Sequence, residues 1–195
     1  MTFIGNMAVH ITDGTTALVT DFPYEGGYGG YMQWSPALVP KGPKPLCLVT
    51  HSHRDHFLPA LAAESCAQIL GPKDVVGAAK VPALALGTDV RQGPVVIRPV
   101  ATPHASLEHY SYVVEWSGQR LYFTGDTDDT AALLAARGLD VAFVSPWLLR
   151  AVQRGGKRID ARRVVVYHHQ DGEVVPPFQD RIVPTQGQVL RLSKR

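Results

Sequence analysis

One short segment of this chain concentrates side chains that bind metal ions. Four ligand-type residues fall within six positions, in His51-Ser52-His53-Arg54-Asp55-His56. His51 and His53 are two apart on an extended segment, so their side chains project to the same side. Imidazole nitrogen and carboxylate oxygen bind zinc, manganese or iron, and the segment holds no cysteine, which disfavours a purely structural zinc site. Metal ions held here would activate water for attack on an electrophilic centre.

Three more ligand-type residues follow predicted strands further along the chain. His104 stands in Ala101-Thr102-Pro103-His104, Asp126 in Thr124-Gly125-Asp126-Thr127, and His168 ends a Val-rich run. A single His or Asp at a strand end is more often an ordinary turn residue. Together, however, they lie in loops that can share one sheet edge with the histidine segment.

The elements that must position these residues are short strands and helices. An alternating hairpin around Asp13-Gly14 precedes a Gly- and Tyr-rich loop, and Leu46–Thr50 is a buried strand that runs into the histidine segment. A helix over Leu58–Leu70 ends at Gly71-Pro72. The remaining expected strands are 95–100, 111–116, 120–124, 141–144 and 164–167, and the remaining helices are 74–79 and 129–137.

Composition limits the class of protein and its partners. A length of 195 residues and a hydrophobic content of 45% suit a single domain over 1–195. The net charge of +2 gives no reason to expect nucleic acid or a membrane surface as a partner. Neither a transmembrane run nor a signal peptide is visible. Cys47 and Cys66 are interpreted as reduced and buried, with a disulfide between them as the less favoured alternative, and reduced cysteines favour the cytoplasm. Oligomeric state is not readable.

The ordered motifs resemble the metallo-β-lactamase superfamily of hydrolases. The resemblance runs from the Asp21 loop to His168, and Val19-Thr20-Asp21-Phe22-Pro23 is similar to the family's early strand ending in Asp-Pro. Gly125-Asp126-Thr127 and the short C-terminal part resemble the lactonase-like branch, which includes L-ascorbate-6-phosphate lactonase-type proteins. The resemblance implies an α/β fold, an αββα sandwich of two mixed β-sheets flanked by helices.

The resemblance also implies a dinuclear site of two divalent ions. Zinc is expected, and manganese or iron would suit the same donors. His51, His53 and His104 would hold one ion, Asp55, His56 and His168 the other, and Asp126 would bridge them. Val166-Tyr167-His168-His169 leaves His169 as an alternative last ligand.

The chemistry implied is hydrolysis by a metal-bound hydroxide, with Asp55 and His56 as catalytic residues. Asp55 would orient the nucleophile and later carry its proton. The substrate would be a small ester, lactone, amide or phosphodiester, since motif residues fix the metals while loops fix specificity. Two alternatives stay open: a mononuclear iron enzyme of the persulfide dioxygenase kind, and a metal-binding scaffold without turnover.

Other side chains are weaker candidates. His109, five positions after His104, is either a supporting group behind the ligands or an ordinary partly buried histidine. The loop aromatics and Trp147 either line a pocket or pack the chain's own core. The basic run from Arg150 to Arg163 is either solvated surface or an anion contact, and Lys73 or Arg150 would then attract an anionic substrate. The loop aromatics are Tyr24, Tyr28, Tyr31 and Trp34.

Overall fold

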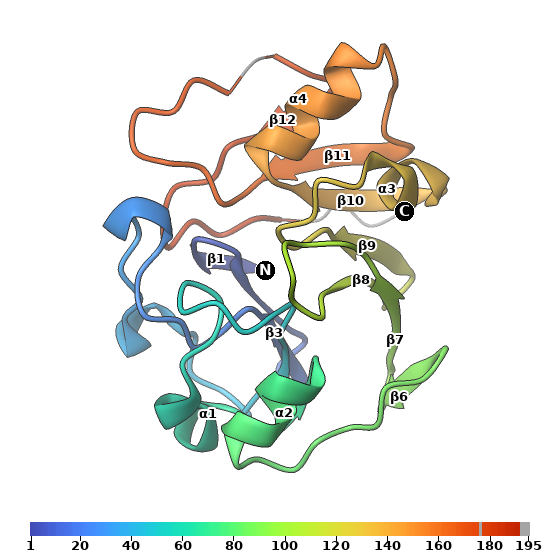
Figure 1. Ribbon diagram of the computed structural model, residues 1–195. Helices are drawn as coiled ribbons and strands as arrows, with labels where there is room; N and C mark the ends of the chain where they lie inside the picture. Colours follow the sequence, from blue (N-terminus) through green and yellow to red (C-terminus); the bar gives the residue numbers. More distant parts are fainter. Residues whose placement is uncertain (176, 192–195) are drawn as a thin grey trace. The chain divides into compact units, whose positions relative to one another are not determined.

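The computed structural model describes residues 1–175 and 177–191, which form two compact units with one mixed sheet each. The first unit comprises Met1–Leu86 and the segment from Thr185 onward, and the second comprises Gly87–Pro184. Figure 1 shows the strands and helices of both. Two mixed sheets with flanking helices confirm the expected class of fold. The assignment of the whole chain to a single domain stays a prediction.

The first unit contains a five-stranded sheet in the order β1-β2-β3-β4-β5. Its first three strands are antiparallel, and β3, β4 and β5 are parallel. The hairpin predicted around Asp13-Gly14 joins β2 and β3, and the Asp13 carboxylate accepts the Thr15 and Thr16 amides in its turn. The strands are β1 (Thr2–Gly5), β2 (Ala8–Thr12), β3 (Ala17–Thr20), β4 (Leu46–Leu48) and β5 (Gln68–Leu70).

Two short α-helices pack on this sheet. Ala62 of α1 (Pro59–Ser65) and Val75 of α2 (Lys73–Ala79) share an apolar cluster with Val19, Cys47 and Ile69 of the strands. The unit also has two 3₁₀ turns, η1 (Tyr28–Gly30) and η2 (Pro36–Leu38). The expected helix over Leu58–Leu70 was wrong at its end, because Gln68–Leu70 is strand β5. A short apolar run such as Ile69-Leu70 suits either element until a neighbouring strand is known.

The two cysteines form a disulfide, which corrects the expectation that both are reduced. Cys47 lies in β4, and Cys66 is the residue that ends α1. Their Cα atoms are 5.8 Å apart, within the range that a disulfide spans. The bond closes a covalent ring around the whole histidine segment, from the strand before it to the helix after it.

The second unit contains a seven-stranded sheet in the order β12-β11-β10-β9-β8-β7-β6. The pairs β9–β10, β10–β11 and β11–β12 are parallel, and the pairs β6–β7, β7–β8 and β8–β9 are antiparallel. Alternate strand residues pack with α3 and α4 in one apolar cluster. The elements are β6 (Val90–Gln92), β7 (Val95–Ala101), β8 (Tyr110–Trp116), β9 (Gln119–Phe123), α3 (Thr130–Ala135), β10 (Leu139–Val144), α4 (Pro146–Arg154), β11 (Ala161–Val166) and β12 (Arg181–Ile182).

Helix α4 was not predicted from the sequence. It begins at Pro146, a residue suited to the first helical turn, and buries Leu148, Leu149 and Val152 on one face. Its other face carries the start of the basic run, where Arg150 pairs with Glu173. Among the described residues, no helix is long and apolar enough to cross a membrane.

Candidate metal centre

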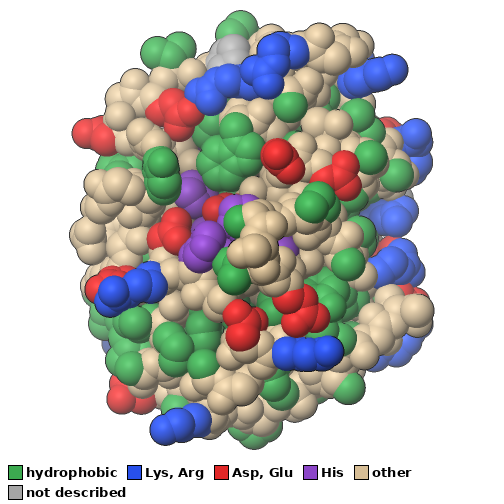
Figure 2. Space-filling model, in the orientation of Figure 1, with side chains coloured by type: hydrophobic (Ala, Val, Ile, Leu, Met, Phe, Trp, Pro, Cys, Tyr) green, Lys and Arg blue, Asp and Glu red, His purple; other side chains and the backbone are tan. Residues whose placement is uncertain are grey.

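The first unit gathers the imidazoles of the histidine segment at the end of β4. His51 Nε2 lies 2.9 Å from His53 Nδ1, and the rings of His51 and His56 are 4.1 Å apart. The two-residue spacing therefore does put His51 and His53 on one side, as the sequence indicates. His51 and His56 are buried while His53 is exposed, and Figure 2 shows histidine side chains (purple) reaching solvent on the face drawn.

Asp21, directly after β3, contacts Thr50 and His56 at the two ends of the segment. Its carboxylate accepts the Thr50 amide at 2.7 Å and the Thr50 hydroxyl at 3.0 Å, and it lies 3.2 Å from His56 Nδ1. A carboxylate accepts and does not donate, so Asp21 stabilises the His56 tautomer that carries its proton on Nδ1. The lone pair on Nε2 is then available to a metal, 3.5 Å from Asp55 Oδ2.

Asn6 and Glu25 attach the glycine-rich loop to the histidine segment. The Asn6 side chain donates to the Asp55 carbonyl at 2.6 Å and accepts the Tyr28 amide at 3.4 Å. The Glu25 amide donates to the Arg54 carbonyl, and the Arg54 guanidinium donates to the Glu25 carboxylate at 2.9 Å. No sequence pattern marks Asn6, because its partners come from two distant segments.

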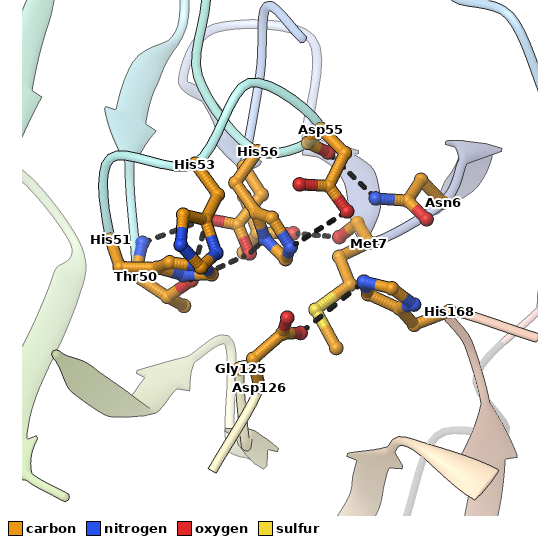
Figure 3. Close-up of polar contacts among 12 residues, drawn as sticks. Asn6, Met7, Thr50, His51, His53, Asp55, His56, Gly125, Asp126 and His168 are labelled. Atoms are coloured by element: carbon orange, nitrogen blue, oxygen red, sulfur yellow. Dashed lines mark hydrogen bonds and ion pairs between the residues drawn. The ribbon is translucent and has the colours of Figure 1, made fainter. Parts of the chain in front are cut away.

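The second unit gathers His104, Asp126 and His168 after β7, β9 and β11. His168 Nε2 lies 3.4 Å from Asp126 Oδ1 (Figure 3), and His104 Nδ1 lies 3.1 Å from the Asp126 carbonyl oxygen. The Trp147 ring packs edge-on against His168 at 5.1 Å, and its Nε1 donates to the Thr127 carbonyl. Trp147 thus packs against a ligand-type side chain, a role that neither of the two alternatives predicted from the sequence had given it.

The neighbouring histidines of the second unit have different partners. His168 faces Asp126, whereas His169 Nε2 lies 3.1 Å from the Pro184 carbonyl oxygen. His168 also adopts a left-handed backbone conformation, with φ of 54°. These contacts favour His168 over His169 as the ligand-type residue beside Asp126.

The separations between donor atoms suit a divalent metal. Two ligands of one tetrahedral ion, with bonds of about 2.1 Å, lie about 3.4 Å apart. Each unit contains donor pairs near this value, and nitrogen with carboxylate oxygen is a donor set that zinc, manganese and iron accept. The pairs are His51 Nε2 and His53 Nδ1 at 2.9 Å, His56 Nε2 and Asp55 Oδ2 at 3.5 Å, and His168 Nε2 and Asp126 Oδ1 at 3.4 Å.

A cavity of about 440 Å³ in the first unit borders this segment. Its walls are the glycine-rich loop from Glu25 to Gly30, with Gln33, Arg54 and Asp55. Of the four loop aromatics, Tyr28 lines this cavity and is 54% exposed, whereas Tyr24 is fully buried. Trp34 packs edge-on against Phe22, as part of the apolar core.

Two relatives are similar in sequence. A UPF0173 protein of Pyrococcus furiosus is 34% identical over 107 residues, which cover 50% of this chain and 50% of that protein. A UPF0173 metal-dependent hydrolase of Deinococcus radiodurans is 29% identical over 165 residues, covering 72% of this chain and 69% of that protein. The chain thus spans about half the length of the Pyrococcus relative. No family model matches the sequence.

Solved structures identify the fold. A metal-dependent hydrolase from Parabacteroides distasonis superposes with a TM-score of 0.65 at 18% identity, over 87% of this chain and 81% of that one. The metallo-β-lactamase fold protein YhfI from Bacillus subtilis gives 0.58 at 14% identity, over 86% and 85%. The chain therefore has the metallo-β-lactamase fold.

Proposed function

We propose that this chain is a metal-dependent hydrolase of a small molecule. The observation that carries the proposal is the set of histidine and carboxylate pairs in each unit, 2.9 to 3.5 Å apart, at strand ends. The Deinococcus relative, named a metal-dependent hydrolase, adds support from sequence. It also disfavours the persulfide dioxygenase alternative.

The proposed site holds two divalent ions, zinc before manganese or iron. His51, His53 and His104 would hold the first ion, Asp55, His56 and His168 would hold the second, and Asp126 would serve both. Support comes from the resemblance to the superfamily and from the donor pairs within each unit. Bound ions of this kind acidify water and polarise the oxygen of a carbonyl or phosphoryl group.

The chain's own residues orient the donors and handle the proton. Asp21 holds His56 in the Nδ1–H tautomer, so that Nε2 faces Asp55. The Asp55 side chain is 23% exposed, and can therefore meet incoming water and substrate. We assign Asp55 the role of orienting the attacking water and passing its proton towards the leaving group. His56, whose Nε2 lies 3.5 Å from the Asp55 carboxylate, is the second proposed catalytic residue.

Metal quantification followed by a substrate panel tests the function. Purified protein is expected to contain two equivalents of zinc, manganese or iron, and to hydrolyse at least one probe among esters, lactones, amides and phosphodiesters. One equivalent of iron with oxygen-dependent turnover would instead indicate the dioxygenase. Bound metal without hydrolysis of any probe would indicate the scaffold without turnover.

We further propose that Tyr28 contacts the substrate in the cavity beside Asp55. Tyr28→Ala is expected to raise KM about fivefold with little change in kcat, since an aromatic contact contributes about 1 kcal/mol. Steady-state kinetics on the best probe measures both constants, and Tyr28→Phe, which keeps the ring, serves as the matched control. Equal KM values for all three proteins would contradict this role.

The finer assignments rest on the sequence. A lactone substrate follows from the resemblance to the lactonase-like branch, and the panel above tests it directly. A cytoplasmic location is part of the same proposal, although the Cys47–Cys66 disulfide removes the support that reduced cysteines had given it.

A further inference from the structure

We infer that His109 is a positioning residue that holds the backbone of Asp126 for the metal centre. This inference rests on the proposed function. His109 is 2% exposed and lies between His104 and β8. Its Nε2 accepts the Asp126 amide at 3.0 Å. A backbone N–H only donates, so Nε2 carries a lone pair and the proton of the neutral ring is on Nδ1.

A chain of buried hydroxyl groups fixes this tautomer. His109 Nδ1 lies 2.9 Å from the Thr102 hydroxyl, which lies 3.1 Å from the Ser111 hydroxyl. The Ser111 hydroxyl donates to the Thr124 carbonyl at 2.6 Å. The amide at one end only donates and the carbonyl at the other only accepts, so every bond between them runs in one direction.

The chain begins and ends on the same loop. Asp126 donates the first bond and Thr124 accepts the last, with Gly125 between them at φ of 62°. The turn that follows β9 is therefore held at two points, by His109 at the Asp126 amide and by Ser111 at the Thr124 carbonyl. The three polar side chains of this chain are buried, so removing one of them costs its neighbours a hydrogen bond. The three are Thr102, His109 and Ser111.

The hydrogen bond from the Asp126 amide to His109 fixes the backbone of the proposed bridging ligand. His104 Nδ1 contacts the Asp126 carbonyl oxygen, and His109 Nε2 accepts from the Asp126 amide. Two histidines therefore hold the two backbone polar groups of Asp126. The Asp126 carboxylate lies 3.4 Å from His168 Nε2. A shift of the Asp126 backbone would change that separation directly, and ligand geometry must be held within a few tenths of an ångström.

Zinc affinity of two His109 variants tests this positioning role. His109→Phe keeps the ring volume and removes the acceptor, and is expected to weaken Zn²⁺ binding about 10- to 100-fold in a chelator competition. His109→Gln offers an amide oxygen near the former Nε2 and is expected to recover much of that loss. His10→Phe is the matched control, because His10 is also buried, at 3% exposure, in strand β2. It is expected to change the melting temperature without changing the zinc affinity.

Nitrogen NMR of the histidines in metal-free protein gives an independent readout. The expected spectrum shows His109 protonated on Nδ1 and unprotonated on Nε2. A proton on Nε2 would overturn this positioning role whether or not metal binds. Wild-type protein that binds no zinc overturns the proposed function and this inference with it. Wild-type protein that binds zinc, together with folded His109→Phe of unchanged affinity, overturns this inference alone.

Discussion

Replacing Asp126 or His53 by alanine is expected to abolish metal binding and hydrolysis together. Asp126 is the proposed bridging ligand, and His53 presents its Nδ1 2.9 Å from His51 Nε2. Loss of a residue behind a ligand costs about 10- to 100-fold in affinity or activity, so loss of a ligand itself should exceed about 100-fold. His53 is exposed, so His53→Ala should fold normally.

Metal content and kcat/KM are measured on the same preparations. Asp128→Ala is the matched control for Asp126→Ala, because Asp128 is an exposed carboxylate two residues along the same loop. It is expected to keep both metal and activity. Full activity in His53→Ala or in Asp126→Ala would refute the ligand assignment for that residue.

The second large effect is expected at Asp21. In Asp21→Asn, one side-chain oxygen is kept for the Thr50 amide, but an NH₂ group can face His56 Nδ1. That group donates, which moves the imidazole proton to Nε2 and removes the lone pair offered to a metal. Zinc affinity is expected to fall about 10- to 100-fold. Chelator competition measures the loss, and circular dichroism establishes that the variant is folded.

Asp13→Asn is the control for this substitution. Asp13 is an exposed carboxylate of the same unit, with a pKa lowered by the Thr16 and Thr15 amides in its turn, and asparagine can accept from the same donors. It should leave zinc affinity unchanged. If Asp21→Asn bound zinc as tightly as the wild type and only melted earlier, Asp21 would be a structural residue with no influence on the ligand.

The strands that carry the ligand-type residues were predictable because each finishes in an apolar run of three residues, with a polar ligand-type residue soon after it. Leu46–Leu48 before His51, Gln119–Phe123 before Asp126 and Ala161–Val166 before His168 lie where the sequence indicates. Burial on both faces leaves this pattern with few alternatives. The side chains that hold the ligands were harder to predict from the sequence, because their roles depend on partners far away in sequence. Asn6 reaches Asp55 across 49 positions, and no local pattern marks such a contact.

Errors occurred where one pattern suits two structures. Ile69 and Leu70 continue the apolar face of α1 but pair with β4 as strand β5. Arg150 and Arg154 were interpreted as solvated surface without a helix, and they lie on the outer face of α4, whose inner face is buried. Cysteine pairing is set by the meeting of β4 with the end of α1, which composition does not reveal.

The disulfide changes what backbone cleavage can do to this protein. Arg54 lies inside the covalent ring from Cys47 to Cys66, and its side chain is 81% exposed. A protease that nicks the chain after Arg54 would open the peptide but leave both fragments joined through sulfur. The upstream piece, carrying His51 and His53, would then remain tethered to the piece carrying His56, and only a reductant could separate them.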